Sequence, residues 1–236
     1  MDVVELLPNL RMLRFSVGQA YLWRDADSLT LIDTGLAGSA SDITKAIAGF
    51  GLAPTDLNQV VLTHFHEDHT GSAADVGAWD GVTVMAHRRD TPIIRGQLPG
   101  PPPVLTDSER TLHAAIVGDG LPPAPPARVD RELDDGDVLP FGDGAHVLAV
   151  PGHTDGSIAL FLPRHGVLFT GDNIAAAPDG RVILGPFNLN RPEAVRSFRR
   201  LADLDSSMAV FGHGDPVLTG AAAVLREVGR RLSSDW

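Results

Sequence analysis

Three histidines and an aspartate lie within six residues of the segment THFHEDHTG, residues 63–71. Imidazole nitrogens and carboxylate oxygens are donors that zinc, iron and manganese accept in proteins. His64 and His66 are two residues apart and start on one face of the chain, whereas Asp68 and His69 are adjacent and point to different places. We expect irregular backbone here, because a helix would not let these four side chains converge. The spacing therefore indicates two metal ions that share one loop.

Four donors cannot saturate two metals, and three later segments offer further candidates. Each is an apolar strand followed by a glycine-containing turn that carries a histidine or an aspartate. The segments are VLAVPGHTDGS with His153, VLFTGDN with Asp172 and AVFGHGD with His213. A glycine before each donor would relieve crowding where the backbone approaches a metal. A single Gly-His pair is usually an ordinary turn, but the shared pattern favours ligands.

The composition argues against several classes of protein. The chain has 236 residues, a formal net charge of −11 and no long basic run, which disfavours nucleic-acid binding. It has no cysteine, which excludes disulfides and thiolate zinc sites. No apolar run approaches the roughly 20 residues that span a bilayer, and the N-terminus lacks a secretion-signal pattern. We expect a cytoplasmic protein with a small-molecule substrate and no membrane association, and its oligomeric state stays open.

Short strands and helices must position these donors. The strand patterns cover residues 10–16, 19–25, 29–35, 59–64, 81–87, 146–152, 157–163, 166–172 and 207–214. Helices are expected at 40–50 (closed by Gly51), in the helix-compatible stretch 71–79, at about 191–203 (opened by Pro192 at its first position) and at about 219–233. The two halves could each supply one sheet of a sandwich flanked by helices.

A proline-rich excursion at about residues 88–131 interrupts this rhythm. Prolines at that density block regular helices and strand ladders. Between them, the segment TDSERTLHAAIVGDG is compatible with a helix that begins after Thr106 or Asp107 and ends near Gly118. The excursion is either an interdomain linker or a stiff lid beside a site. In the lid hypothesis, residues 95–126 cover the metals.

The sequence resembles the metallo-β-lactamase superfamily of hydrolases. The motifs LIDTG, THFHEDHTG, PGHTDGS, FTGDN and FGHG occur in that order and cover nearly the whole chain. The resemblance implies an αββα sandwich, with two mixed β-sheets flanked by helices, as a single domain over residues 1–236. It also implies a metal site along one edge of the sheets.

The resemblance assigns a role to each donor. The first metal would bind His64, His66 and His153, and the second would bind Asp68, His69 and His213, with Asp172 bridging both. Asp33 of LIDTG would orient the ligand loop, and Thr63 and Thr154 would support the ligands by hydrogen bonds. The remaining histidines (His87, His113, His146 and His165) are expected to be surface or structural, and Glu67 is expected to be solvated.

The implied chemistry is hydrolysis with two zinc ions, although iron or manganese would also suit the donors. The charges of Asp68 and Asp172, the residues that we assign to catalysis, only partly balance two divalent ions. Metals lower the pKa of bound water far below its bulk value, towards about 7, and a bridging hydroxide would attack an ester, lactone, thioester or amide carbonyl. Phe187, Asn188 and Arg191 are candidates for the substrate rim.

The motifs favour a glyoxalase II-like or lactonase-like branch. Asp172 is present and cysteine is absent, which argues against a dedicated β-lactamase and leaves promiscuous lactam turnover open. Only 23 residues follow His213, fewer than the glutathione-holding helical region of glyoxalase II needs. A redox protein with a di-iron site on the same fold and a phosphodiesterase stay as alternatives.

Overall fold

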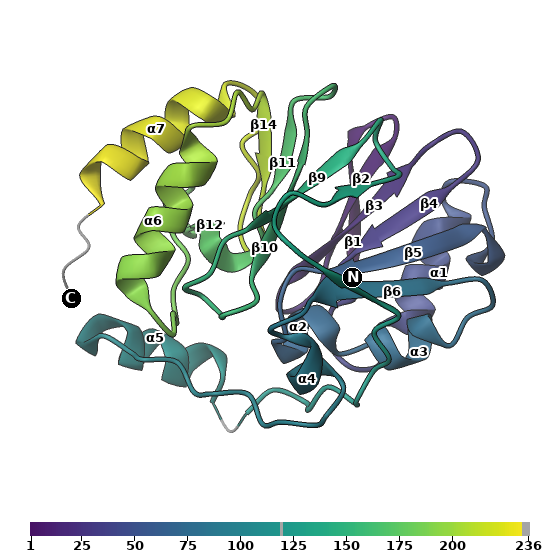
Figure 1. Cartoon of the computed structure of the whole chain (residues 1–236), viewed down its shortest axis with the longest axis horizontal. Coiled ribbons are helices and arrows are strands. Elements are labelled where there is room, and N and C mark those ends of the chain that lie inside the picture. The colour runs from purple at the N-terminus through teal and green to yellow at the C-terminus, as the bar shows by residue number, and fades with distance from the viewer. Residues whose placement is uncertain (119, 233–236) are drawn as a thin grey trace. The chain divides into compact units, whose positions relative to one another are not determined.

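The computed structural model describes residues 1–118 and 120–232 of the chain (Figure 1). These residues divide into two compact units, each with a hydrophobic core. The first unit contains Met1–Gly100, Pro122–Leu133 and Pro140–Gly142, and the second contains the other described residues.

The first unit is built on a seven-stranded mixed sheet whose strands follow one another in sequence order. The first four strands are antiparallel neighbours, and the last four run parallel. The strands are β1 (Asp2–Leu7), β2 (Leu10–Arg14), β3 (Gln19–Arg24), β4 (Leu29–Ile32), β5 (Leu57–Leu62), β6 (Thr83–His87) and β7 (Arg131–Leu133).

Four short helices accompany this sheet: α1 (Ala40–Ala48), α2 (Glu67–Thr70), α3 (Ala73–Gly77) and α4 (Thr91–Ile94), together with a 3₁₀ turn at Pro54–Asp56. Ile43, Ala46 and Ile47 are three or four residues apart in α1, so they line one face of the helix. That face is buried in a core with Val60 and Leu62 of β5. The same strand then carries the chain directly into the histidine cluster.

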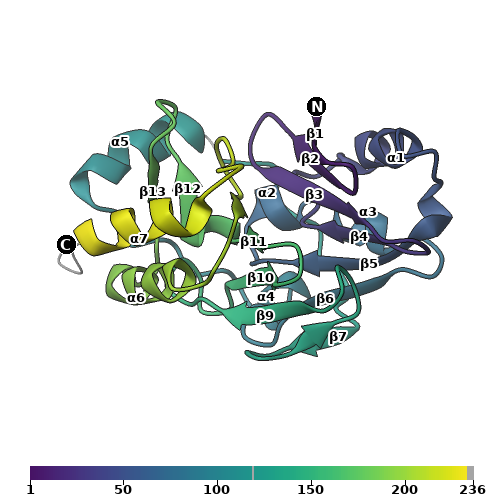
Figure 2. The same ribbon diagram turned by 90° about the horizontal axis from the view of Figure 1, so that it is seen from above.

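The second unit has a five-stranded mixed sheet in the order β14-β11-β10-β9-β8 and a separate antiparallel pair, β12 with β13. The strands are β8 (Val138–Leu139), β9 (Ala145–Ala149), β10 (Ile158–Leu162), β11 (Val167–Phe169), β12 (Ile174–Ala176), β13 (Val182–Leu184) and β14 (Met208–Val210). The helices are α5 (Asp107–Ile116), α6 (Arg191–Ala202) and α7 (Ala221–Arg231), with a 3₁₀ turn at Gly171–Asn173. α6 and α7 pack against each other (Figure 2) and bury Phe198 and Leu225.

The proline-rich excursion is divided between the units. Residues 101–121, which include α5, belong to the second unit, and the flanking residues belong to the first. Of the two proposed starts of α5, Thr106 is the N-cap: its hydroxyl accepts from Glu109 N at 3.3 Å, and Glu109 Oε2 accepts from Thr106 N at 2.9 Å. Residue 119 of the predicted helical segment lies outside the described residues.

Several predicted boundaries were wrong by a few residues. α1 ends at Ala48 rather than at 50, because Gly49 already caps it. α6 begins at Arg191 after the N-cap Asn190, whose side chain accepts from Glu193 N, so Pro192 is the second residue of the helix. The predicted end of the last helix at residue 233 lies outside the described residues.

Five strands were not predicted: β1, β7, β8, β12 and β13. β1 is mostly exposed, so it lacks the alternation of buried and exposed residues by which a strand is recognised. The others contain two or three residues, too few for a periodic pattern. Among the described residues, no helix combines the length and apolar composition needed to cross a membrane.

Candidate metal centre

The donors of the first unit follow the carboxyl ends of parallel strands. β4 and β5 are parallel neighbours with Ile32 opposite Val61, and Asp33 N donates to Val61 O at 3.0 Å. Asp33 and Thr63 therefore leave the same edge of the sheet, next to each other. This edge is where α/β sheets usually bind ligands.

Asp33 connects the two ends of the histidine cluster through its carboxylate. Oδ1 accepts from Thr63 N at 2.7 Å, and Oδ2 accepts from the Thr63 hydroxyl at 2.8 Å and from His69 Nδ1 at 2.8 Å. The aspartate is only 3% exposed and has a left-handed backbone conformation, with φ of 59°. Aspartate adopts this conformation more readily than most residues. The contacts fit a residue that orients the ligand loop.

These hydrogen bonds determine which ring nitrogen carries the proton in two of the histidines. Because the Thr63 hydroxyl donates to Asp33, its oxygen accepts from His64 Nδ1, which lies 3.0 Å away. His69 Nδ1 donates to the same carboxylate. Both rings therefore keep a lone pair on Nε2, the form that metal-binding histidines take when a carboxylate or hydroxyl holds the other nitrogen.

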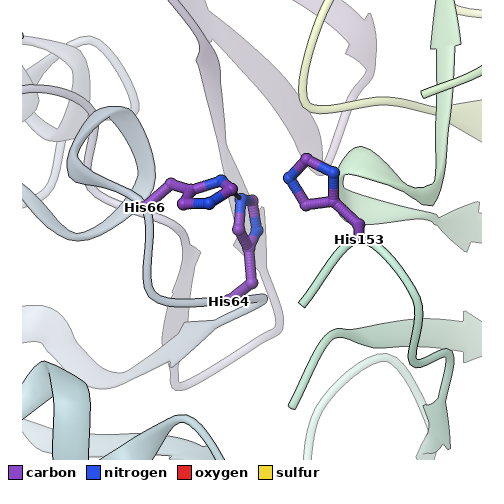
Figure 3. Close-up of side chains that lie close together, drawn as sticks. All are labelled: His64, His66 and His153. Carbon is purple, nitrogen blue, oxygen red and sulfur yellow. Dashed lines mark hydrogen bonds between the residues drawn. The ribbon is translucent and has the colours of Figure 1, made fainter. Parts of the chain in front are cut away.

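The remaining donors of this unit lie close to those lone pairs. His64 Nε2 and His66 Nδ1 are 3.0 Å apart, and the two rings point toward one another (Figure 3). Two nitrogens bound at about 2.1 Å to one tetrahedral metal are about 3.4 Å apart, so the observed spacing suits a shared ion. Asp68 Oδ2 lies 3.6 Å from His69 Nε2. The donor set of this unit thus fits a divalent cation in both atom type and spacing.

The backbone of the cluster differs from the irregular loop that we expected. Glu67–Thr70 forms one helical turn, α2, which begins after His66. Thr34 stabilises the turn, since its N–H and hydroxyl both donate to His69 O, at 2.7 and 2.9 Å. Successive side chains in a helix point about 100° apart, which separates Asp68 from His69 without irregular backbone. A turn this short has no periodic signal in the sequence.

The donors of the second unit also follow strand ends. β11 and β14 are parallel neighbours, and β9 runs in the same direction because both β9 and β11 are antiparallel to β10. Asp172 follows β11, His213 follows β14, and His153 follows β9. Backbone hydrogen bonds join the first two turns, with Gly212 N donating to Gly171 O at 3.1 Å.

Two imidazoles of this unit converge on one carboxylate oxygen. His213 Nε2 lies 3.1 Å and His153 Nε2 lies 3.7 Å from Asp172 Oδ2. His153 and Asp172 are buried, and the side chain of His213 is 34% exposed. Asp172 Oδ2 is therefore a carboxylate oxygen close to two imidazole nitrogens, and both atom types are donors that a metal accepts.

Close backbone packing holds the turns of the second unit. A Cβ added to Gly185 would lie 1.7 Å from Asp172 O, and one added to Gly152 would lie 2.2 Å from Ala194 N. We had expected the glycine before His153 to make room for a metal. Gly152 instead makes room for the backbone of helix α6. Thr154 orders the same turn, because its N–H donates to Ser157 Oγ at 3.0 Å and its hydroxyl lies 2.8 Å from that oxygen.

Sequence reasoning missed Asp90 as a support for the histidine cluster. Asp90 is only 1% exposed, and its Oδ2 accepts from the N–H of Phe65, which lies between two of the predicted ligands. It follows β6, the parallel neighbour of β5, so its position after a strand end is a signal that the sequence did contain. The supports of this cluster therefore come from the ends of three adjacent strands.

The other residues singled out from the sequence lie in varied environments. Glu67 is exposed, as expected for a solvated residue. His87 is buried at the end of β6, and His113, His146 and His165 are partly or fully exposed. Phe187 and Arg191 are partly buried, but Asn188 is only 1% exposed, and its Nδ2 donates to Gly185 O at 2.7 Å. In this structure Asn188 therefore supports its loop from inside and does not form part of an exposed rim.

Residues 13–213 match the model of the metallo-beta-lactamase superfamily. The chain belongs to this superfamily. It is similar to the probable metallo-hydrolase YflN of Bacillus subtilis (strain 168), with 32% identity over 88% of this chain and 83% of that protein. It is also similar to a metallo-beta-lactamase family protein of Thermus thermophilus, TTHA1429, whose crystal structure matches with a TM-score of 0.67 and 26% identity over 96% of this chain and 78% of that one.

A third relative is the hydroxyacylglutathione hydrolase of Aeromonas hydrophila subsp. hydrophila, at 29% identity over 87% of this chain. The chain spans only 64% of that enzyme's length. Together, these relationships confirm three predictions: the superfamily, the αββα fold with two mixed sheets flanked by helices, and a hydrolase activity. The superfamily is metal-dependent, and the histidines and aspartates described above are candidate ligands.

Proposed function

We propose that the chain is a dinuclear zinc-dependent hydrolase that cleaves an ester, lactone, thioester or amide bond of a small molecule. Iron and manganese are the alternative metals. The proposal includes a single domain over residues 1–236, a cytoplasmic location, no nucleic-acid or membrane partner and a lid at residues 95–126. The observation that carries it is that side chains with metal-binding atoms follow strand ends in each unit. There are four such donors in the first unit and three in the second.

His64, His66 and His153 would hold the first ion, and Asp68, His69 and His213 would hold the second. Asp172 would contact both ions, which agrees with the convergence of two imidazoles on its Oδ2. When bound, the metals would supply a water of lowered pKa and would polarise the carbonyl that is cleaved.

The protein's own residues prepare this chemistry before any substrate binds. Asp33 and Thr63 hold the protons of His64 and His69 on Nδ1, so no proton must move for Nε2 to act as a ligand. Asp68 and Asp172 contribute two negative charges against the four positive charges of two divalent ions. The site would therefore stay positive and attract a carbonyl oxygen or an anion on an otherwise acidic protein.

The names of the relatives restrict the substrate class only in part. Hydroxyacylglutathione hydrolases are thioesterases by name, and a thioester is one of the bonds in the proposal. Because the chain spans less than two thirds of that relative, recognition of a glutathione group does not follow. The proposal therefore specifies a substrate with a hydrolysable carbonyl group and does not specify the leaving group.

Metal analysis of the purified protein, followed by a panel of lactones, thioesters, esters, β-lactams and phosphodiesters, tests the proposal. We expect two zinc ions per chain, no visible absorbance and hydrolysis of carbonyl substrates. His69→Ala should lower both metal content and activity. His165→Ala is the matched control, because His165 is an exposed histidine beside Asp143 outside both donor sets.

Two results would contradict the proposal. Iron with visible absorbance and no hydrolysis would favour the redox alternative. Two metals and full activity in His69→Ala would remove the ligand assignment.

A further inference from the structure

The loop of residues 185–190 is hydrogen-bonded to two of the three ligand-bearing turns of the second unit. At one end, Gly185 N donates to Asn173 O at 3.0 Å, next to the bridging aspartate. At the other end, Leu189 N donates to His153 O at 3.2 Å. The residue in the middle of this loop is therefore held beside both turns.

That residue is Phe187, which has a left-handed backbone conformation with φ of 64°. Bulky residues rarely adopt this conformation, and it persists where the surroundings enforce it. Helix α5 supplies contacts that do so: Glu109 Oε1 accepts from Phe187 N at 3.3 Å, and the ring of His113 meets the Phe187 ring edge-on at 5.1 Å between centroids. Val104 N also donates to Asn188 O at 3.0 Å. The segment around α5 thus holds Phe187 in place.

The face of α5 that contacts Phe187 also presents exposed apolar side chains. Leu112 and Ile116 lie three and seven residues after Glu109, on the same side of the helix as Glu109 and His113. Each is 44% exposed, and no residue of α5 is buried. Exposed large apolar residues that gather beside a candidate site are typical of a surface that a ligand covers.

On the basis of the hydrolase function above, we propose that Phe187, Leu112 and Ile116 form an apolar surface that binds the acyl or aryl group of the substrate. We call these three residues the Phe187 surface. The occupant is the substrate because the loop that carries Phe187 is hydrogen-bonded to the turns that carry the candidate ligands. The enzyme then prefers carbonyl substrates with long apolar acyl groups to acetyl substrates of the same leaving group.

A series of p-nitrophenyl esters from acetate to octanoate, tested on the zinc-loaded full chain, measures this preference. We expect kcat/KM to rise by roughly fourfold for each added methylene that is buried. Phe187→Ala and the double variant Leu112→Ser/Ile116→Ser should flatten that rise, because kcat/KM for octanoate falls far more than kcat/KM for acetate. Val224→Ser is the matched control, because Val224 is an exposed apolar residue of helix α7 in the same unit.

Calorimetric titration with octanoate and acetate gives a readout that does not depend on turnover. Octanoate should bind at least about tenfold more tightly than acetate, with the negative heat-capacity change of apolar burial. Phe187→Ala should remove this difference, and Phe187→Leu, which keeps an apolar side chain, should keep part of it. Circular dichroism of each variant verifies that it is folded.

The outcomes separate this inference from the proposed function. An active hydrolase with no dependence on acyl length and equal binding of octanoate and acetate would overturn the Phe187 surface alone. Octanoate binding that depends on Phe187, in a zinc protein that hydrolyses no carbonyl substrate, would support the surface and reject the hydrolase. A dimer that Leu112→Ser/Ile116→Ser dissociates would show that a second copy covers this face, and would overturn the inference.

Discussion

The two units prepare their ligands in different ways. In the first unit, side chains orient the ligands, because Asp33 and Thr63 hold the ring protons of His64 and His69. In the second unit, the backbone fixes the ligand turns, which depend on close contacts at Gly152 and Gly185. The candidate ligands of both units nevertheless follow the ends of β-strands. The feature that the two units share is therefore the placement of ligands at a sheet edge.

This difference predicts different consequences for mutations. A substitution among the supporting side chains of the first unit should change proton positions and metal affinity while the fold stays intact. A substitution at a supporting glycine of the second unit should displace a whole turn and lower stability. Three variants compare these consequences, in order of decreasing effect on activity.

Asp172→Asn should have the largest effect, because it removes the one donor assigned to both ions. We expect kcat/KM to fall by roughly 1000-fold or more, since lost metal removes both water activation and carbonyl polarisation. Steady-state kinetics and the zinc content per chain measure the change. A variant that kept two zinc ions and most of its activity would show that the second unit does not supply a bridging ligand.

Asp33→Asn should lower zinc affinity by about 10- to 100-fold, the usual cost of losing a carboxylate behind a metal-binding histidine. Asparagine also tolerates a left-handed backbone, so the turn should keep its conformation, and the unfolding free energy should fall only by the hydrogen bonds that the amide cannot accept. Competition with a chromophoric chelator measures the affinity. Asp143→Asn is the matched control, since Asp143 also has a positive φ, of 58°, and lies 3.4 Å from His165 outside the donor sets.

Gly185→Ala should act mainly on stability. The added Cβ would collide with Asp172 O, and overpacking of this kind costs about 1–3 kcal/mol or more of unfolding free energy. Urea denaturation of the metal-free protein measures it. Gly229→Ala in α7 is the control of opposite sign: its Cβ would meet Phe198 at an ordinary 3.5 Å, so alanine should stabilise the helix by about 0.5–1 kcal/mol. Unchanged stability of Gly185→Ala would remove the contrast between the units.

The sequence predicted the strands that deliver the donors because those strands are apolar and end in turns with glycine. β5, β9, β11 and β14 all carry this pattern. The order of the motifs added the fold class, which pattern alone left open. The first signal is local and the second extends along the chain, and together they indicated the seven residues that the structure also offers as possible metal ligands.

Other features depend on contacts between segments far apart in the chain. Asp90 supports the cluster through a backbone N–H 25 residues earlier; its position after a strand end indicates the sheet edge but not this partner. The attachment of α5 to Phe187 spans 78 residues between Glu109 and its partner. The hairpin of β12 and β13 has strands of three residues, too short to show a period. Such features follow from tertiary packing, and tertiary contacts cannot be recognised from a single sequence.

The seven candidate ligands should hold two metal ions as one dinuclear centre. Zinc X-ray absorption fine structure of the two-zinc protein measures this, because neighbouring metals scatter from each other. We expect a nitrogen and oxygen shell together with a zinc–zinc distance of about 3.5–4 Å, lost in Asp172→Asn. Two bound zinc ions per chain without any zinc–zinc scattering would show separate sites and reject a dinuclear centre.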